Sequence, residues 1–332
     1  MTNTIDKSHQ QRIAEQIRQY EAKGNMHSEL TSIYTYWQQK YVAPRLRDLT
    51  GYNNHLELYA RTFIEAIKRT GNNRIVSIGS GDGTLENQIA QTMIQYGHTD
   101  FRMILLELSP IQNRRALDQA RENGISDKFE AHEVDLNDWK PAEKCGAIMA
   151  HHSLHHILEL EKLFDAIHEA LEDGGRFVTF DMIGRNGHMR WPEVYRIVNG
   201  IWKFLPEEKR LHLLLRRIDD EFYNHDCSTE GFEGIRAQDI LPLLVERFHF
   251  DTFFAWGGLI DPFIDRGYSA HFDPQNPLDA GFIDFLQDIN DILTETGYLK
   301  PTQLLGVMAK APIENPKYYR GWLPETMVRV PS

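Results

Sequence analysis

Short apolar runs alternate with amphipathic helical patterns from residue 74 to residue 181. The apolar runs predict strands at 74–78, 101–107, 129–134, 146–151 and 176–181, and the helical patterns predict helices at 84–96, 110–123 and 159–172. Strands that are apolar throughout and alternate with helices form parallel sheets with helices on both faces. The pattern therefore predicts a doubly wound α/β core, in which ligands bind beyond the carboxyl ends of the strands.

The chain before this core carries only helical patterns. Apolar residues recur at helical spacing over 13–20, 30–46 and 56–67. We expect residues 1–70 to form a helical lid on a core that spans 71–310. The aromatic side chains of the second helix, which include Tyr34 and Trp37, are expected either to pack within the lid or to close over a ligand.

A long insertion separates the fifth strand from the next core helix, at 237–247. Because residues 184–230 begin at the carboxyl end of a strand, we expect them to overhang the site, with helical patterns near 197–205 and 211–215. A strand at 248–256, a wall rich in Pro and Gly at 259–280, a helix at 280–295 and a strand at 304–309 complete a seven-stranded core. Residues 311–332 are expected to form an extended tail that docks on this protein or on a partner.

Composition narrows the class of protein. The 332 residues are 41% hydrophobic and 25% charged, as in soluble globular chains, and the net charge of −12 argues against binding to nucleic acid or to an anionic membrane. Cys145 and Cys227 offer neither a disulfide framework nor a metal-ligand spacing. With a polar N-terminus and no apolar run of membrane-spanning length, we expect a cytoplasmic protein that acts on a small molecule and is able to form a homodimer.

Three glycines on alternate positions follow the first predicted strand, at Gly79, Gly81 and Gly83. Glycines there allow positive φ and let a ligand approach the main chain. A dinucleotide fingerprint would place its third glycine one residue later, where this chain has Thr84, and the turn has no basic residue to bind a pyrophosphate. The turn therefore favours a nucleoside ligand without phosphates, such as S-adenosylmethionine, with Ser80 among its contacts.

Acidic residues end the next two predicted strands. Glu107, followed by Leu108, stands where a carboxylate could accept hydrogen bonds from both ribose hydroxyls. Asp135 could accept from an adenine amino group while Leu136 packs on the ring. The alternatives are a solvated surface glutamate at 107 and a turn- or helix-capping aspartate at 135.

The chain resembles the seven-stranded, Rossmann-like S-adenosylmethionine-dependent methyltransferases in these motifs. The resemblance lies in the segment Ser77 to Gly83, in Glu107, in Asp135, and in a strand that leads into Leu154-His155-His156, an ending frequent among members that act on small molecules. It covers about residues 70–185. It implies that the glycine turn lies near the methionine moiety, Glu107 at the ribose and Asp135 at the adenine.

The chain departs from this family at one position. Members often have an acidic residue where this chain has Ser77, and that acid helps to hold the turn or the methionine amino group. A serine can form a hydrogen bond there but brings no charge. We include Ser77 among the expected cofactor contacts.

Four histidines fall within the six residues 151–156. Histidines at positions i and i+4 could bind a metal on a helix, but a strand end that enters a loop and the family resemblance both favour a site without metal. We expect His151 or His152 beside the cofactor and either His152 or His155 as the general base, because imidazole can take a proton at neutral pH. Asp181, at the end of the fifth strand, is a further candidate for base or substrate contact. Core or capping roles are the alternative for each histidine.

The start of the insertion is the candidate substrate site. Arg185, His188, Arg190 and Trp191 could bind a planar or carboxylate-bearing substrate, because arginine offers a fork of donors and tryptophan a stacking face. The alternative is a helix N-terminus in which Pro192 follows Trp191.

The sequence therefore predicts an S-adenosylmethionine-dependent methyltransferase that acts on an O, N or C nucleophile of a small molecule, such as a natural product or a carboxylate-bearing compound. One alternative is a non-catalytic S-adenosylmethionine-binding or regulatory protein. The other is a nicotinamide-dependent oxidoreductase, which the displaced third glycine disfavours.

Overall fold

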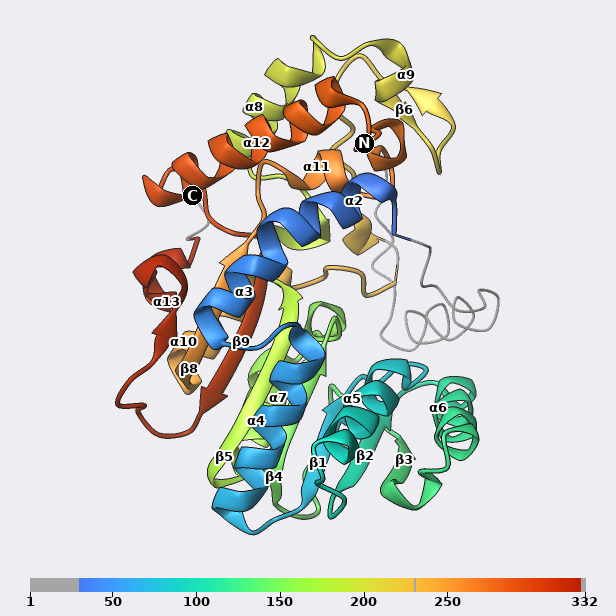
Figure 1. Ribbon diagram of the computed structural model, residues 1–332, viewed down its shortest axis with the longest axis vertical. Helices are drawn as coiled ribbons and strands as arrows, with labels where there is room; N and C mark the ends of the chain where they lie inside the picture. The colour runs from blue at the N-terminus through green and yellow to red at the C-terminus, as the bar shows by residue number, and fades with distance from the viewer. Residues whose placement is uncertain (1–29, 230, 330–332) are drawn as a thin grey trace.

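One central β-sheet organises the molecule, with helices on both faces and a helical cap over the carboxyl ends of its strands (Figure 1). The structure is a computed structural model and describes residues 30–229 and 231–329. The first predicted helix, over 13–20, lies outside the described residues. Within those ranges no helix is both long and apolar enough to cross a membrane.

The sheet has eight strands in the order β3-β2-β1-β4-β5-β9-β8-β10. All neighbouring strands are parallel except that β9 runs antiparallel to β5 and β8, which confirms the predicted doubly wound, mostly parallel fold. The strands are β1 Arg74–Ile78, β2 Arg102–Glu107, β3 Phe129–Glu133, β4 Cys145–His151, β5 Leu171–Met182, β8 His249–Trp256, β9 Gln303–Ala309 and β10 Lys317–Tyr318.

Alternate residues of the strands face two separate hydrophobic cores. Ile75 points into one core and Val76 into the other, because successive side chains of a strand lie on opposite faces. The first core is covered by α4 His55–Thr70, α5 Thr84–Gln95 and α6 Pro110–Glu122, and the second by α7 Leu160–Ala170 and α10 Ala237–Arg247. Strands buried on both faces are expected to be mainly apolar, as the central strands β2 and β4 are, whereas the edge strand β3 is more exposed and more polar.

A third hydrophobic core holds the cap together. It draws on segments that are far apart in the sequence, among them Trp37, Trp202, Phe263 and Ile283. The helices concerned are α2 Ser32–Trp37, α8 Pro192–Trp202, α11 Asp261–Ile264 and α12 Pro277–Glu295. Residues 30–70 are thus divided between two layers, because α2 packs in the cap while α4 packs on the sheet.

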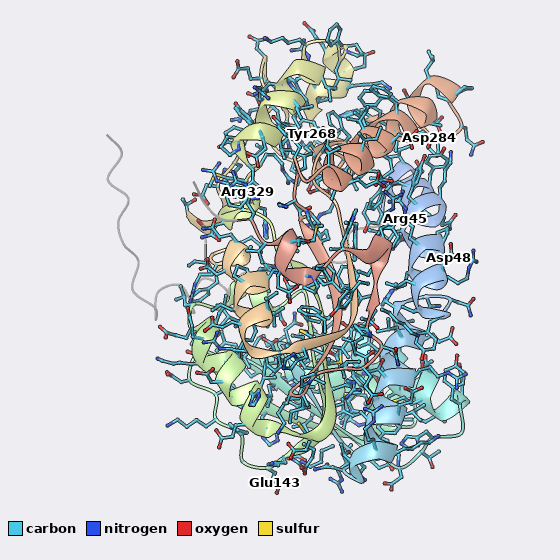
Figure 2. All side chains as sticks on the ribbon, turned by 90° about the vertical axis from the view of Figure 1, so that its left-hand side faces the viewer. Arg45, Asp48, Glu143, Tyr268, Asp284 and Arg329 are labelled. Carbon is cyan, nitrogen blue, oxygen red and sulfur yellow. The ribbon has the colours of Figure 1, made fainter. Side chains whose placement is uncertain are left out.

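Polar contacts fix the N-terminal helices to α12. A π-helical turn, Gln38–Val42, joins α2 to α3 Ala43–Thr50, and Arg45 pairs with Asp291 at 2.5 Å. Lys40 pairs with Asp284 at 2.8 Å. Figure 2 shows Arg45 and Asp284 on adjoining parts of the two helices, and places Tyr268 of the cap at the end of the molecule opposite Glu143, which precedes β4.

Two segments differ from the sequence-based expectation. The leucines at 211–215 do not continue a helix, because a short helix α9, Glu207–Arg210, is followed by a hairpin of β6 Leu211–His212 and β7 Arg217–Ile218. Leu214 and Leu215 do not form the apolar face of a helix but line the cavity below the cap. The C-terminal segment adds the eighth strand, β10, to the edge of β8, and its short helix α13, Pro324–Met327, packs near α10.

Candidate active site

A cavity of about 1010 Å³ lies between the carboxyl ends of the central strands and the cap. The residues that follow β1, β2, β3 and β4 form its floor, as expected for ligand sites of open α/β sheets. The cap contributes walls from α2, from the 184–230 insertion and from the 259–280 segment. Tyr34 and Trp37 are among the lining residues, so the aromatic side chains of α2 both pack in the cap and face the cavity.

The glycine turn after β1 brings main chain to the cavity. Gly79 and Gly81 have φ of +66° and +55°, in the region that favours glycine. A Cβ on Gly79 would lie 2.6 Å from the Cβ of Ser153, so no other residue fits there without displacement. A Cβ on Gly81 would meet no atom within 4 Å, and Gly81 and Ser80 both line the cavity. The turn therefore leaves a cradle that a side chain at position 81 would fill.

Glu107 is fixed by the same turn. Its Oε2 accepts a hydrogen bond of 3.0 Å from the N–H of Gly81, and its Oε1 accepts one of 2.9 Å from the N–H of Ser109. Burial raises the pKa of Glu107, while these backbone N–H groups act against the rise. The carboxylate is held at the cavity wall by β2 and the turn together, and Leu108 follows it there.

The residues predicted near the adenine, Asp135 and Leu136, reach the cavity, and so does His151, predicted beside the cofactor. The hydroxyl of Tyr59 lies 3.1 Å from Nδ1 of His151. Asn137 lines the cavity as well, and its side-chain oxygen accepts from the N–H groups of residues 158 and 159. The structure thus brings together the ends of β2, β3 and β4, whose side chains the sequence could only place at one edge.

Two predicted cofactor contacts lie away from the cavity. A Cβ on Gly83 would lie 2.4 Å from the Cβ of Ala116, so this glycine allows α5 and α6 to pack closely and does not approach a ligand. Ser77 is buried in β1 and donates a hydrogen bond of 2.6 Å from Oγ to Oε1 of Glu86. It is Glu86, on α5, that lines the cavity.

A chain of carboxylates and histidines forms another part of the wall. Asp181 Oδ1 and His155 Nδ1 are 2.6 Å apart, His155 Nε2 lies 3.5 Å from Glu233 Oε1, and the same oxygen is 2.7 Å from His188 Nε2. The short helical turns Leu154–His156 and Asn186–His188 carry these histidines, and Glu233 comes from the segment before α10. His155, His188 and Glu233 line the cavity.

Asp181, predicted as a candidate base or substrate contact, does not reach the cavity. It is fully buried. Its Oδ2 accepts from the N–H groups of Ser153 and Leu154 at 2.9 and 2.8 Å, which fixes the turn that carries His155. Asp181 is therefore a positioning residue, because a carboxylate that binds Nδ1 of a histidine sets the orientation of its ring.

The chain of charges shifts the pKa values of His155, Asp181 and Glu233. Burial disfavours a charged His155, but Asp181 and Glu233 outweigh it and raise its pKa to about 10. Burial acts to raise the pKa of Asp181 and of Glu233, yet their histidine partners hold both well below the usual range. At neutral pH the site therefore holds an imidazolium between two carboxylates.

Two further histidines of the 151–156 segment, His152 and His156, remain neutral at pH 7. Burial lowers the pKa of His156 to about 3, and the charge of His155 adds to the effect. Desolvation within the cavity lowers the pKa of His152 to about 4. The ring of His152 is open to the cavity, and its φ of +50° matches that of His188 at +55°. Left-handed backbone is uncommon outside glycine, so two cavity histidines are held in sparsely populated conformations.

The predicted substrate residues are only partly brought together. Arg185 and Arg190 line the cavity, but Arg190 pairs with Asp261 at 2.8 Å. Trp191 does not line it. The indole is buried in the cap core just before α8, which begins at Pro192. The guanidinium carbons of Arg185 and Arg329 lie 5.9 and 4.6 Å from its ring centroid.

Sequence reasoning missed Glu86 and Glu233. An acid in the first turn of a helix is common because it complements the helix dipole, so Glu86 gave no separate signal. Glu233 lies in a segment without periodicity, 45 residues from His188 in the chain. Only tertiary contacts bring it to the histidines.

Comparison with known proteins gives one family. A family model described as a methyltransferase domain matches residues 52–217. No curated protein matches the chain.

Solved structures with a similar arrangement share little sequence. The [4+2]-cyclase SpnF is 16% identical, with 85% of this chain and 96% of that chain covered and a TM-score of 0.42. The geranyl diphosphate C-methyltransferase from Streptomyces coelicolor A3(2) is 16% identical, with 87% and 86% covered and a TM-score of 0.41. An O-methyltransferase from a trans-AT PKS multienzyme of Brevibacillus brevis is 14% identical, with 80% and 79% covered and a TM-score of 0.41.

The residues present fit S-adenosylmethionine. The cradle at Gly81 admits a ligand against the main chain, Glu107 offers a carboxylate beside it, and Glu86 has a buried oxygen without a partner. None of these residues is a cation that would bind phosphate. With the family model matched over half of the chain and these features at the end of β1, the chain belongs to the methyltransferase domain family and is an S-adenosylmethionine-dependent methyltransferase.

Proposed function

We propose that this methyltransferase methylates a hydroxyl oxygen of an enclosed small molecule, with His188 as the general base. The observation that carries the proposal is the 2.7 Å hydrogen bond between His188 Nε2 and Glu233 Oε1 in the cavity wall. An ionised carboxylate can only accept, so Nε2 of His188 donates, and in an imidazole that acts as a base Nδ1 is then the acceptor. Among the described residues nothing hydrogen-bonds to that Nδ1.

His155, one of the predicted bases, is less suited to that role. Both of its ring nitrogens face carboxylates, and with its pKa raised to about 10 it is already protonated at neutral pH. A protonated imidazole cannot accept a proton, but its charge favours an oxygen that becomes negative. In the proposed reaction His155 therefore lies beside the base and stabilises the negative charge that develops on the substrate oxygen.

The protein's own residues have three tasks in this reaction. When bound, S-adenosylmethionine supplies a methyl group that its sulfonium makes electrophilic. The cavity aligns the acceptor and excludes water, and alignment of that kind contributes roughly 7–11 kcal/mol to rate enhancements. Nδ1 of His188 takes the hydroxyl proton as the oxygen–carbon bond forms, and Glu233 stabilises the resulting imidazolium.

The side chains that line the cavity favour a planar substrate that carries an anionic group. Phe180 and Trp256 offer aromatic faces, and Arg185 lines the same cavity. The guanidinium of Arg185 donates to the carbonyl of Arg190, and no described residue forms a carboxylate pair with it. It is therefore open to a substrate carboxylate, which arginine binds through two parallel hydrogen bonds. A roofed cavity and a net charge of −12 support a small molecule over nucleic acid.

Substitution of the base separates this proposal from its alternatives. On a panel of hydroxyl-, amine- and carbon-acceptor compounds, we expect turnover of aromatic hydroxy acids. His188→Gln and Glu233→Gln should lower kcat by about 10²- to 10⁴-fold. Affinity for S-adenosylhomocysteine should not change, and His132→Gln, at an exposed histidine outside the cavity, serves as the control. Turnover of amines alone, or unchanged kcat in His188→Gln, would contradict the proposal, and cofactor binding without any turnover would favour a non-catalytic protein.

A metal-assisted reaction is the second candidate. His155, His188 and Glu233 each offer one ligand atom, and these atoms lie within 4.8 Å of one another. Nδ1 of His155 is held by Asp181, which is how metal-binding histidines are commonly oriented. In that case a divalent cation would bind the substrate hydroxyl and lower its pKa, and His188 would be a ligand instead of the base.

A further inference from the structure

Glu86 is a buried carboxylate at the glycine turn. It lies in the first turn of α5, three residues after Gly83, and only 2% of the residue is exposed. It nevertheless lines the cavity, next to Gly79 and Gly81. An acid placed only to complement the helix dipole would stay in solvent, where it would cost nothing to ionise. Its burial therefore needs another explanation.

The two oxygens of this carboxylate have different surroundings. Oε1 accepts the 2.6 Å hydrogen bond from Oγ of Ser77, which comes from β1. Oε2 is buried and has no hydrogen-bond partner. Buried carboxylates are normally paired, and an unpaired one is costly. One half of the group is positioned by the protein, and the other half is left for something that the protein does not supply.

No cation of the described chain compensates this charge. Glu86 forms no ion pair with a lysine, arginine or histidine among residues 30–229 and 231–329. Its charged neighbours, Asp82 and Glu107, are acidic, and burial together with these neighbours raises its pKa to about 7. A group in such surroundings favours a ligand that brings a positive charge.

We propose that Glu86 binds the ammonium group of the amino-acid portion of S-adenosylmethionine, with Ser77 holding the carboxylate in place. The ammonium would supply Oε2 with a hydrogen-bond donor and the carboxylate with a nearby positive charge, neither of which the described chain provides. Where members of the family often have an acid at position 77 of β1, this chain has Ser77, and the carboxylate comes from Glu86 of α5, which is hydrogen-bonded to Ser77. The inference concerns the cofactor and does not depend on the acceptor or base proposed above.

Asp82 is the competing carboxylate. It also lines the cavity at the turn, but its Oδ1 already accepts a hydrogen bond of 3.1 Å from the N–H of Thr84. Asp82 is only half-buried, so solvent can satisfy its remaining oxygen. Asp82→Asn is therefore the matched control, since it removes one carboxylate from the same turn.

The test is calorimetric binding of two probes to the full chain. These are S-adenosylhomocysteine and its analogue in which hydrogen replaces the amino group. Glu86→Gln, which keeps the shape and an acceptor for Ser77, should weaken S-adenosylhomocysteine roughly 10- to 100-fold and leave the analogue's affinity unchanged. Asp82→Asn should affect both probes little. Equal weakening of both probes in Glu86→Gln, or selective weakening in Asp82→Asn, would overturn the inference.

A second readout does not depend on affinity. At pH 6 a carboxyl with a pKa near 7 is mostly protonated and would ionise when it meets the ammonium, so binding of S-adenosylhomocysteine should release close to one proton. Calorimetry in buffers of different ionisation enthalpy measures that proton, and Glu86→Gln should not release it. Failure of the wild-type protein to bind S-adenosylhomocysteine would contradict the cofactor itself, whereas wild-type binding with the same proton count in both proteins would refute only the role of Glu86.

Discussion

Asp181 Oδ1 and His155 Nδ1 lie 2.6 Å apart at the end of β5, with both side chains buried. Because Asp181 also accepts hydrogen bonds from the N–H groups of Ser153 and Leu154, it connects the turn after β4 to the charged histidine. The pair therefore fixes the position of His155, which in turn lies next to the Glu233 carboxylate that contacts His188.

Asp181→Asn should therefore destabilise the protein strongly. The substitution keeps the size of the side chain but leaves the imidazolium without its nearest counter-charge, and breaking a buried pair typically costs about 3–5 kcal/mol of unfolding free energy. Chemical denaturation measures the change. Asp173→Asn is the control in the same strand, because Asp173 pairs with Lys310 at the surface, where solvent screens the charges. Equal effects of the two substitutions would contradict the assignment.

Gly81→Val should abolish cofactor binding. A valine at this position would occupy the cradle that Gly81 leaves open at the cavity wall, so affinity for S-adenosylhomocysteine should fall by at least about 100-fold. Gly97→Val is the matched control. Gly97 also has positive φ and no atom within 4 Å of its Cβ position, but it follows α5 and does not line the cavity. Comparable losses in both variants would mean that backbone strain, and not ligand approach, explains the effect.

The unfolding free energy of the cofactor-free protein should depend on pH through Glu86. Its pKa is about 7 in the folded state and about 4.5 in the unfolded chain, so between these values the folded protein keeps a proton that the unfolded chain has released. Stability should therefore fall as pH rises from 4.5 to 7, by on the order of 3 kcal/mol from this group, and then stay level. Glu86→Gln should lack this fall, whereas Glu122→Gln, at an exposed glutamate of α6, should keep it. The measurement is the unfolding free energy of the three proteins between pH 4 and pH 8, from thermal or chemical denaturation.

Removal of divalent metals should leave methyl transfer unchanged if His188 acts as the base. Activity is measured after dialysis against a chelator and again after addition of Mg²⁺, Mn²⁺ or Zn²⁺. Loss of activity that one metal restores would favour the second candidate, in which His155, His188 and Glu233 bind the ion.

The fold could be predicted because its signals are local. The β1 residues form a short apolar run that stops at glycines, and a helix pattern follows at once, so strand, turn and helix were each encoded within a few residues. The hairpin at 211–218 was missed because here the local pattern is misleading. Leu211, Leu214 and Leu215 have helical spacing, yet only Leu214 and Leu215 line the cavity, and spacing alone does not say what a side chain packs against.

The candidate site was predicted where it sits at strand ends. Glu107 and His151 end the buried strands β2 and β4, Asp135 follows β3, and parallel strands bring their carboxyl ends to one edge. Gly83 and Trp191 were placed at the ligand although they serve packing, because a glycine that permits a close helix contact and one that permits a ligand look the same in sequence.

The sequence by itself determined the order of strands and helices, the glycine bend and the row of polar residues at the sheet's edge, since these depend on neighbours in the chain. Only the tertiary structure decided which acid faces the glycine turn, which histidine has a free nitrogen and what closes the cavity. Glu86 meets Ser77, and Glu233 meets His188, through packing between distant segments, and the charge and burial that set their chemistry exist only after that packing has formed.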